Sequence, residues 1–366
     1  MKIVNIYNGF LSENFQGGGV RYIKNLIAQQ KKLGFEVEVI CCGSTKIKTK
    51  TINGCKYNFV SNSLTWPLFL LRLLVFMIVN RKNYKDQMFH IHRSYFAPAL
   101  LFLSSPRIFL TIHTKTFHVI TSKFTIIKYL LPILIKIDNF IINKLITTVS
   151  IAGHEARKNF KNYSLKNKKL VFLPPPIFLN KQKLKISLNN TILIVGRLSP
   201  VKRPQKIISL IHNAYMIDPI TIKKFKFIFI GDGELKETLQ KMIGTLNLSS
   251  IIKLAGNITY NNVLKYYRKC NKTILLSESE IGPYVVKESL FFGKAVFTTN
   301  VGDIKNYFTK DCGRIIPKSK PENRMKEFLD FLNTDYSSKK IQETILRQID
   351  LENKSFTNNL IKLYAK

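Results

Sequence analysis

Two glutamates eight residues apart stand on either side of a Gly-Pro pair in the second half of the sequence. Glu280 precedes Gly282 and Pro283, and Glu288 lies in the helical stretch that follows. A strand that ends in such a loop and continues as a helix exposes backbone N–H groups, which together with the helix dipole attract an anion. Ionised carboxylates accept hydrogen bonds from neighbouring hydroxyl groups. The segment therefore predicts a pocket for a ligand with an anionic part and hydroxyl-rich parts.

A second segment places two cations directly after a strand. The buried-type run 191–195 ends at Gly196, and Arg197 and Lys202 follow before a helix predicted from about residue 204 to 214. The guanidinium group of arginine presents a fork of donors, whereas the lysine ammonium acts as a point charge. Together they carry the charge needed to neutralise a diphosphate leaving group.

Both segments resemble signatures of glycosyltransferase family 4. The run from Glu280 to Glu288 is similar to the E-x7-E signature of that family, and the run from Gly196 to Lys202 is similar to its G-R-L-x-x-x-K-G motif. The resemblance implies that Glu280 contacts the hydroxyls of a donor sugar and that Glu288 binds the ribose of its nucleotide. It also implies that Arg197 and Lys202 hold the pyrophosphate.

The first half of the chain carries a weaker part of the same resemblance. Gly17 and Gly18 lie in the loop before the first predicted helix, where small residues let backbone N–H groups approach the donor phosphates. His90, His92 and His113 all lie at the ends of predicted strands. The resemblance implies that His113 contacts the reacting sugar, whereas for His90 and His92 we favour packing at the end of the sheet.

The resemblance thus implies a full set of site residues. The implied catalytic residues are His113, Glu280, Arg197 and Lys202. The implied donor-binding residues are Gly17, Gly18, Gly196, Arg197, Lys202, Glu280, Gly282, Pro283 and Glu288.

Three places depart from the family pattern. Arg203 stands where glycine is usual, and we expect it to alter the turn while the roles of Arg197 and Lys202 are kept. Residues 174–176 are all proline where Pro-Asn-Gly is frequent, and residues 114–115 are Thr-Lys where Gly or Asp is commoner.

The order of predicted elements agrees with this resemblance. Residues 3–40 alternate strand, loop, helix and strand, a βαβ unit that predicts a parallel sheet with ligands at its carboxyl edge. The alternation restarts after the prolines at 174–176, which we interpret as a hinge. We expect a GT-B fold of the α/β class, with two Rossmann-like doubly wound domains facing across a cleft. The acceptor domain is placed at 1–178 and the donor domain at 179–350, and a helix at 355–365 is expected to pack back on the first domain.

The resemblance implies a retaining transfer from a nucleotide sugar to a glycan or lipid-linked acceptor. A place in the synthesis of cell-surface polysaccharide, such as lipopolysaccharide, O-antigen or capsule, would suit such a reaction. We find no D-x-D pair to hold a metal-bound diphosphate, so we expect no metal and no cofactor, with Arg197 and Lys202 supplying the positive charge. No carboxylate in the first half stands out as a nucleophile, which favours a front-face mechanism with the leaving diphosphate as base.

Positive charge dominates the composition. The 366 residues include 58 Lys and Arg against 22 Asp and Glu, a formal net charge of +36. Two explanations of this excess are open: a solvated coat of surface lysines, or binding to an anionic partner. If residues 124–146 form a helix, Lys128, Lys136, Asn139 and Asn143 fall on one stripe beside an apolar face. That helix belongs either to the core of the first domain or to an anionic membrane surface, and with the basic region 157–185 it favours peripheral association with the inner leaflet.

Two other features bear on location. The apolar run 66–79 is too short to span a bilayer, and the run 124–146 contains four charged residues, so we expect neither to cross. The five cysteines are odd in number and show no CxxC spacing, which indicates reduced structural thiols. We expect a cytoplasmic protein, peripheral on the inner face of the membrane.

Other classes of function stay open. A nucleotide-sugar epimerase, or another enzyme of GT-B fold such as a glycan phosphorylase, would share the two-domain pattern. A nucleic-acid-binding protein would account for the charge, but the sequence has no zinc, RNP-like or helix-turn-helix signal. A nicotinamide oxidoreductase would need a GxGxxG run with a downstream acid, which is absent.

Overall fold

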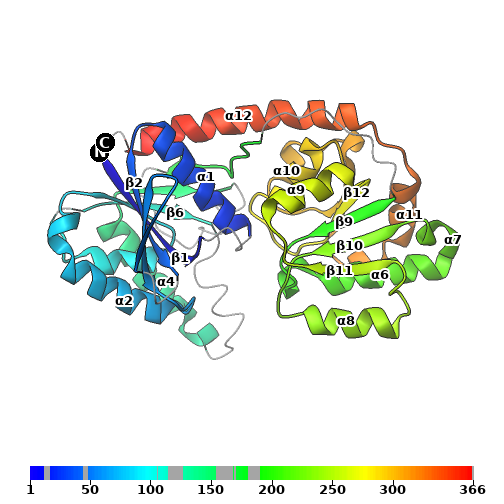
Figure 1. Cartoon of the computed structure of the whole chain (residues 1–366), viewed down its shortest axis with the longest axis horizontal. Helices are drawn as coiled ribbons and strands as arrows, with labels where there is room; N and C mark the ends of the chain where they lie inside the picture. The colour runs from blue at the N-terminus through cyan, green and yellow to red at the C-terminus, as the bar shows by residue number, and fades with distance from the viewer. Residues whose placement is uncertain are drawn as a thin grey trace. The chain divides into compact units, whose positions relative to one another are not determined.

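The computed structural model describes residues 1–11, 17–43, 48–104, 106–113, 127–153, 168, 170–179 and 190–364, with side chains from residue 132 onward in the helix that begins at 127. The chain divides into two compact units (Figure 1). The first unit contains residues 1–15, 19–176 and 353–366, and the second contains 16–18 and 177–352. The boundary between the units falls between residues 176 and 177, two residues before the predicted boundary between 178 and 179.

In the described part of the first unit, eight strands form one sheet in the order β3-β4-β2-β1-β5-β6-β7-β8. All neighbours are parallel except β3 and β4. The order reverses between β1 and β5, so the sheet is doubly wound as predicted. The strands are β1 (Lys2–Phe10), β2 (Glu36–Cys42), β3 (Thr49–Ile52), β4 (Cys55–Ser61), β5 (Met88–Ile91), β6 (Arg107–Ile112), β7 (Thr148–Ile151) and β8 (Leu170–Phe172).

Helices cover both faces of this sheet. They are α1 (Gly18–Lys32), α2 (Trp66–Val79), the 3-10 helices η1 (Arg81–Tyr84) and η2 (Ser94–Leu100), α4 (Ile127–Leu145) and the end of α12 (Ser338–Tyr364). On one face, Gln30 of α1 donates to the Tyr364 hydroxyl of α12 at 2.6 Å. On the other face, α2, η2 and α4 share one apolar core with the strands. The last turns of α12 also contact β8, because Asn359 donates to the Phe172 carbonyl at 2.9 Å.

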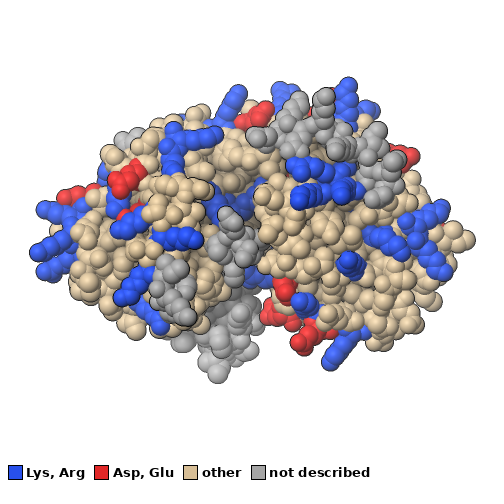
Figure 2. Space-filling view, viewed as in Figure 1, with Lys and Arg blue, Asp and Glu red and all other residues tan. Residues whose placement is uncertain are grey.

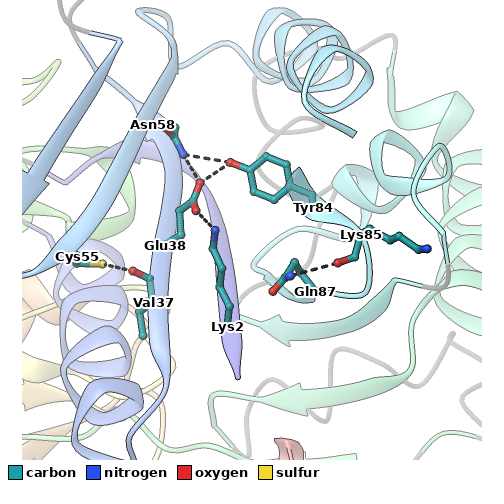
Figure 3. A network of polar contacts seen from close by, with 8 residues as sticks. All are labelled: Lys2, Val37, Glu38, Cys55, Asn58, Tyr84, Lys85 and Gln87. Carbon is teal, nitrogen blue, oxygen red and sulfur yellow. Dashed lines mark hydrogen bonds and ion pairs between the residues drawn. The ribbon is translucent and has the colours of Figure 1, made fainter. Parts of the chain in front are cut away.

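A buried carboxylate ties the first unit together at its sheet. Three donors surround the carboxylate of Glu38 on β2: the ammonium of Lys2, the amide of Asn58 and the hydroxyl of Tyr84 (Figure 3). Lys2 belongs to β1 and Asn58 to β4, the two strands that flank β2. Burial and the hydrogen bond to Glu38 raise the pKa of Tyr84. The network fixes the register of three strands against η1.

Glu38→Ala is expected to lower the free energy of unfolding of the first unit by about 3–5 kcal/mol. It leaves the half-buried ammonium of Lys2 and the buried donors of Asn58 and Tyr84 without their acceptor. Trp66 is the single tryptophan of the chain and lies in α2, so its fluorescence in urea reports on this unit. Glu36 is exposed on the same strand, and Glu36→Ala is expected to change stability by about 0.5 kcal/mol or less. Equal losses in the two variants would contradict the role given to the network.

In the described part of the second unit, six parallel strands form a sheet in the order β11-β10-β9-β12-β13-β14. The order reverses between β9 and β12, so this unit is doubly wound too. The strands are β9 (Thr191–Val195), β10 (Lys226–Ile230), β11 (Ile252–Gly256), β12 (Lys272–Leu275), β13 (Ala295–Thr299) and β14 (Gly313–Ile316). The helices are α6 (Pro204–Ile217), α7 (Pro219–Lys223), α8 (Lys236–Thr245), α9 (Tyr260–Lys269), α10 (Tyr284–Phe291), α11 (Met325–Asn333) and the start of α12. Short 3-10 turns are η3 (Pro200–Lys202), η4 (Ile304–Asn306), η5 (Lys310–Cys312) and η6 (Pro321–Asn323).

Candidate functional site

The reversal of strand order in the second unit lies where the two predicted motifs meet. Open parallel sheets bind ligands outside the carboxyl ends of the strands at such a reversal. The loop after β9 holds residues 196–203, and the loop after β12 holds residues 276–283. The amide of Glu278 donates to the carbonyl of Val201 at 2.8 Å. This hydrogen bond fixes the two motif loops to each other.

Lys202 and Glu280 form an ion pair between these loops. The two residues are 78 positions apart in the sequence, and it is the sheet topology that brings them together. Their side chains are 28% and 14% exposed, so the pair is sheltered but open to a ligand. A site that holds one cation and one carboxylate side by side can bind a diphosphate beside a hydroxyl-rich group.

Glycines pack the loops of this edge against each other. At Gly231, with φ of +140°, a Cβ atom would lie 2.0 Å from the carbonyl oxygen of Gly196. At Gly233 it would lie 2.4 Å from the carbonyl oxygen of Leu198. The Gly231-Asp232-Gly233 segment therefore holds the loop after β9 in place, because only glycine allows the two backbones so close.

Arg203 adopts the left-handed conformation, with φ of 52° and ψ of 44°, at the residue before α6. Glycine reaches this region without strain, whereas a side chain adds about 1–2 kcal/mol. The arginine side chain makes its own contacts there. Its guanidinium donates to the Lys318 carbonyl at 2.7 Å and lies 3.5 Å from the carboxylate of Glu278. The substitution for glycine thus keeps a left-handed turn and adds a polar link to it.

Arg203→Gly is expected to be more stable than Arg203→Ala by about 1–2 kcal/mol, because both lose the same contacts and only alanine keeps the strain. Chemical denaturation measures the difference. Lys206 lies three residues later, inside α6. There the order of stability should reverse, so that the Lys206→Gly variant is about 1 kcal/mol less stable than the Lys206→Ala variant. The same order at both positions would show that the left-handed conformation is not strained.

The remaining predicted residues of the second unit lie on the same loops or on α10. Arg197 is exposed, on the loop that also carries Lys202. Gly282 and Pro283 connect Glu280 to the first residue of α10. Glu288 lies within α10, is 3% exposed, and accepts a hydrogen bond from the hydroxyl of Tyr260 at 3.2 Å. Nothing in the sequence singled out Tyr260, since its only signal is a helix start after Thr259.

In the first unit, the predicted histidines lie at the carboxyl ends of β5 and β6. His90 is fully buried, with its ring nitrogens on the Tyr364 hydroxyl and, at 2.6 Å, on the Thr111 hydroxyl. His92 Nδ1 lies 3.1 Å from His113 Nε2. Burial lowers the pKa of His90 and of His113 to about 3, and that of His92 well below its usual range. All three rings are therefore uncharged at neutral pH.

The structure describes only some of the other residues predicted in the N-terminal half of the chain. Gly18 opens α1, Gly17 precedes it, and both are exposed. Residues 114–115, most of the basic region 157–185 and the side chain of Lys128 lie outside the described residues. Within the described ranges, no three His, Cys, Asp or Glu side chains are grouped as metal ligands.

Sequence comparison identifies relatives of parts of the chain. Residues 177–347 match the family described as glycosyl transferases group 1. An uncharacterized glycosyltransferase, MJ1178, of Methanocaldococcus jannaschii is 29% identical over 129 residues, which are 35% of this chain and 36% of that protein. A Campylobacter jejuni protein named GalNAc-alpha-(1->4)-GalNAc-alpha-(1->3)-diNAcBac-PP-undecaprenol alpha-1,4-N-acetyl-D-galactosaminyltransferase is 30% identical over 103 residues, 28% of this chain and 27% of that protein. The chain thus matches about a third of the length of one curated relative and about a quarter of the other.

Structural comparison covers nearly the whole chain. The crystal structure of a mutant of S. aureus TarM in complex with fondaparinux, alpha-GlcNAc-glycerol and UDP has a TM-score of 0.73 at 12% identity, and the match covers 98% of this chain and 99% of TarM. This likeness over both α/β units confirms the GT-B class of fold predicted from the sequence. Lys202, Glu280 and Glu288 all lie within residues 177–347, the segment that matches the glycosyl transferases group 1 family.

Proposed function

We propose that this protein is a retaining glycosyltransferase that moves a sugar from a nucleotide-sugar donor to a glycan or lipid-linked acceptor. The observation that carries the proposal is the contact of Lys202 with Glu280 at the strand reversal of the second unit. Lys202, with Arg197 on the same loop, neutralises the diphosphate of the donor, and Glu280 accepts hydrogen bonds from the sugar hydroxyls. Glu288 binds the ribose, and His113 of the first unit contacts the reacting sugar.

The names of similar proteins support the choice of substrates. The TarM complex contains UDP and an alpha-linked GlcNAc, and the Campylobacter protein is named for transfer to a sugar chain on PP-undecaprenol. By analogy we propose a nucleoside-diphosphate sugar as donor and a lipid-linked glycan as acceptor, in the synthesis of lipopolysaccharide, O-antigen or capsule.

The charges at the site support the following mechanism. The developing negative charge on the leaving diphosphate is stabilised by Lys202 and Arg197 at the moment the sugar bond breaks. The diphosphate oxygen on the same face of the sugar then accepts the proton of the attacking hydroxyl. We propose that no metal takes part, because two cationic side chains supply the charge. Activity that vanishes with EDTA and returns with Mg²⁺ would overturn this point.

A panel of UDP-, GDP- and ADP-sugars tests the function directly. We expect one donor to raise the melting temperature of the protein and to release its nucleoside diphosphate when an acceptor is added. An epimerase would alter the sugar and keep the nucleotide attached, and a phosphorylase would require inorganic phosphate. Product analysis by mass spectrometry separates these outcomes, and either of them would replace the proposal.

We also propose that the first unit associates with an anionic membrane from the cytoplasmic side. The helices α2 and α4 cover the same face of its sheet, so their outer sides point away from that sheet in the same direction. Those outer sides are apolar and exposed, an arrangement typical of interaction surfaces. We call the following six residues the outer apolar surface: Leu71, Val75, Val79, Ile133, Ile137 and Phe140.

The charge around this surface suits a lipid bilayer with acidic headgroups. Lys136 and Lys144 are exposed on α4, and Arg81 and Lys82 are exposed in η1, which a single residue separates from the end of α2. The single acidic residue among α2 and the described side chains of α4, Asp138, is buried against Ser94. Figure 2 shows Lys and Arg spread over the visible face with few acidic residues among them. None of the helices in the described ranges has the length and hydropathy to cross a bilayer. The contact that we propose is with the bilayer surface.

Val75→Asp with Ile137→Asp is expected to weaken binding to vesicles of anionic phospholipid by about tenfold or more, because two apolar side chains no longer enter the interface. Flotation of the protein with vesicles measures the bound fraction. A matched control is Met216→Asp with Ile220→Asp, two exposed apolar residues of the second unit, which should bind as the parent does. An equal loss in both pairs, or binding indifferent to lipid charge and salt, would contradict the proposed surface.

A further inference from the structure

We infer that His92 is a positioning residue, which fixes the tautomer of His113 so that His113 presents a ring N–H to the substrate. The inference rests on the proposed function insofar as it gives His113 a substrate to contact. It assigns a role to a histidine that sequence reasoning had placed in packing alone.

The two rings are held together by neighbouring strands. β5 and β6 are parallel partners, with Ile91 beside Leu110, and His92 and His113 follow their last residues. Nδ1 of His92 lies 3.1 Å from Nε2 of His113. The rings of Tyr22 and His113 pack edge to face, with centroids 4.6 Å apart and planes at 84°. Neither ring can turn over without breaking these contacts.

The proton in this contact can belong to only one of the two rings. Both rings are neutral, since burial lowers the pKa of each, and a neutral imidazole has one N–H and one lone pair. If His113 donated through Nε2, the proton of His92 would sit on its own Nε2. That nitrogen is buried and has no hydrogen-bond partner in the part of the chain that is described.

An orphaned buried N–H group is rarer and more unfavourable than an acceptor without a donor. The favoured arrangement therefore has His92 donating from Nδ1 to Nε2 of His113. The group of His92 without a partner is then the lone pair on Nε2. The proton of His113 lies on its Nδ1. His113 is partly exposed, whereas His92 is only 3% exposed. His113 is thus the ring available to a ligand.

This arrangement determines the chemistry that His113 performs. Its Nε2 is occupied by His92, so Nδ1–H is left for the substrate. An N–H donates a hydrogen bond to an oxygen of the sugar or of the diphosphate, and it cannot accept the proton of an attacking hydroxyl. His113 then binds and orients the donor, and the role of base stays with the leaving diphosphate.

Two amide variants test which nitrogen of His92 matters. The amide nitrogen of asparagine falls near the position of Nδ1, and that of glutamine falls near Nε2. His92→Asn should therefore keep the hydrogen bond to His113, whereas His92→Gln and His92→Leu should lose it. We expect kcat/KM for sugar transfer to stay within about threefold in the Asn variant and to fall about tenfold in the other two.

Nitrogen-15 NMR of histidine-labelled protein supplies a readout that does not depend on activity. We expect His113, assigned by loss of its signals in His113→Gln, to carry its proton on Nδ1 in the parent and in His92→Asn, and to become a mixture of tautomers in His92→Leu. A proton on Nε2 in the parent would overturn the inference, as would equal activity of the Asn and Leu variants when both are folded. A protein with the expected tautomers but no transfer from any donor would refute the proposed function and leave the positioning role intact.

Discussion

Glu280→Gln and Lys202→Met are each expected to lower kcat/KM for sugar transfer by about 10²–10³-fold while the protein still folds. In the proposed mechanism the Glu280 carboxylate binds sugar hydroxyls, and the Lys202 ammonium stabilises the negative charge on the leaving diphosphate. Because the pair is partly exposed, its own contribution to stability is about 1 kcal/mol or less. Loss of activity and loss of stability should therefore be clearly separable in thermal unfolding and steady-state kinetics.

The double variant decides whether the pair serves catalysis or merely joins two loops. If the contact were only a salt bridge, removing both charges would relieve the unpaired partner and recover much of the activity. If each group acts on a different part of the donor, the double variant is at least as impaired as the worse single variant. We expect the second result.

The chain offers a matched control in the same unit. Lys206 on α6 pairs with Glu322 in the same way, with side chains 47% and 16% exposed. Lys206→Met and Glu322→Gln remove an ion pair of similar kind that belongs to neither motif loop. Activity of these variants should stay within about threefold of the parent. An equal loss of activity in the Lys202–Glu280 variants and in the Lys206–Glu322 variants would show that the activity depends on loop stability and not on contacts with the donor.

The sequence predicted the second unit well because most of its strands are short apolar runs. The strand at 191–195 has the predicted bounds, and the helix predicted from about residue 204 to 214 is observed from Pro204 to Ile217. The doubly wound fold follows from the βα alternation, and the chain order of the strands places Lys202 and Glu280 on the two loops beside the reversal. The Lys202–Glu280 contact itself was not predicted. Each motif had been assigned to a ligand, and side-chain pairing depends on loop geometry that no spacing shows.

The first unit was harder to predict because several of its features arise only from packing. The strand β3 is an exposed antiparallel edge strand, and β4 alternates polar and apolar residues, so neither has the pattern of a buried strand. In the sequence, Glu38 is a single charged residue inside an apolar run. The donors on Lys2, Asn58 and Tyr84 come together around it only in the folded unit. The pairing of His92 with His113 likewise depends on the adjacency of β5 and β6, which come from segments 21 residues apart.

The buried histidines are expected to make the first unit acid-labile. Burial lowers the pKa of His90 and His113 to about 3 and that of His92 well below its usual range, whereas an unfolded histidine titrates at about 6.5. Between these values the unfolded chain binds more protons than the folded one, so the free energy of unfolding falls as pH falls. The stability is fully present above about pH 6.5. Three such rings predict a loss of roughly 3–4 kcal/mol between pH 6 and pH 5.

Urea unfolding followed by Trp66 fluorescence at pH 7, 6 and 5 measures this loss in the first unit alone, since Trp66 is the only tryptophan. Ordinary carboxylates titrate mainly below this range, so they contribute little to the slope. His90→Asn will change the absolute stability, because it alters the contacts with Tyr364 and Thr111. The informative quantity is the slope of the free energy of unfolding against pH. This slope should fall by about a third, because one of the three rings with a lowered pKa has been removed. A parent slope near zero would mean that the rings take up protons in the folded protein as readily as in the unfolded chain, and a slope unchanged by His90→Asn would mean this of His90. A charged His113 would then donate from both ring nitrogens, and no fixed tautomer would remain for His92 to select.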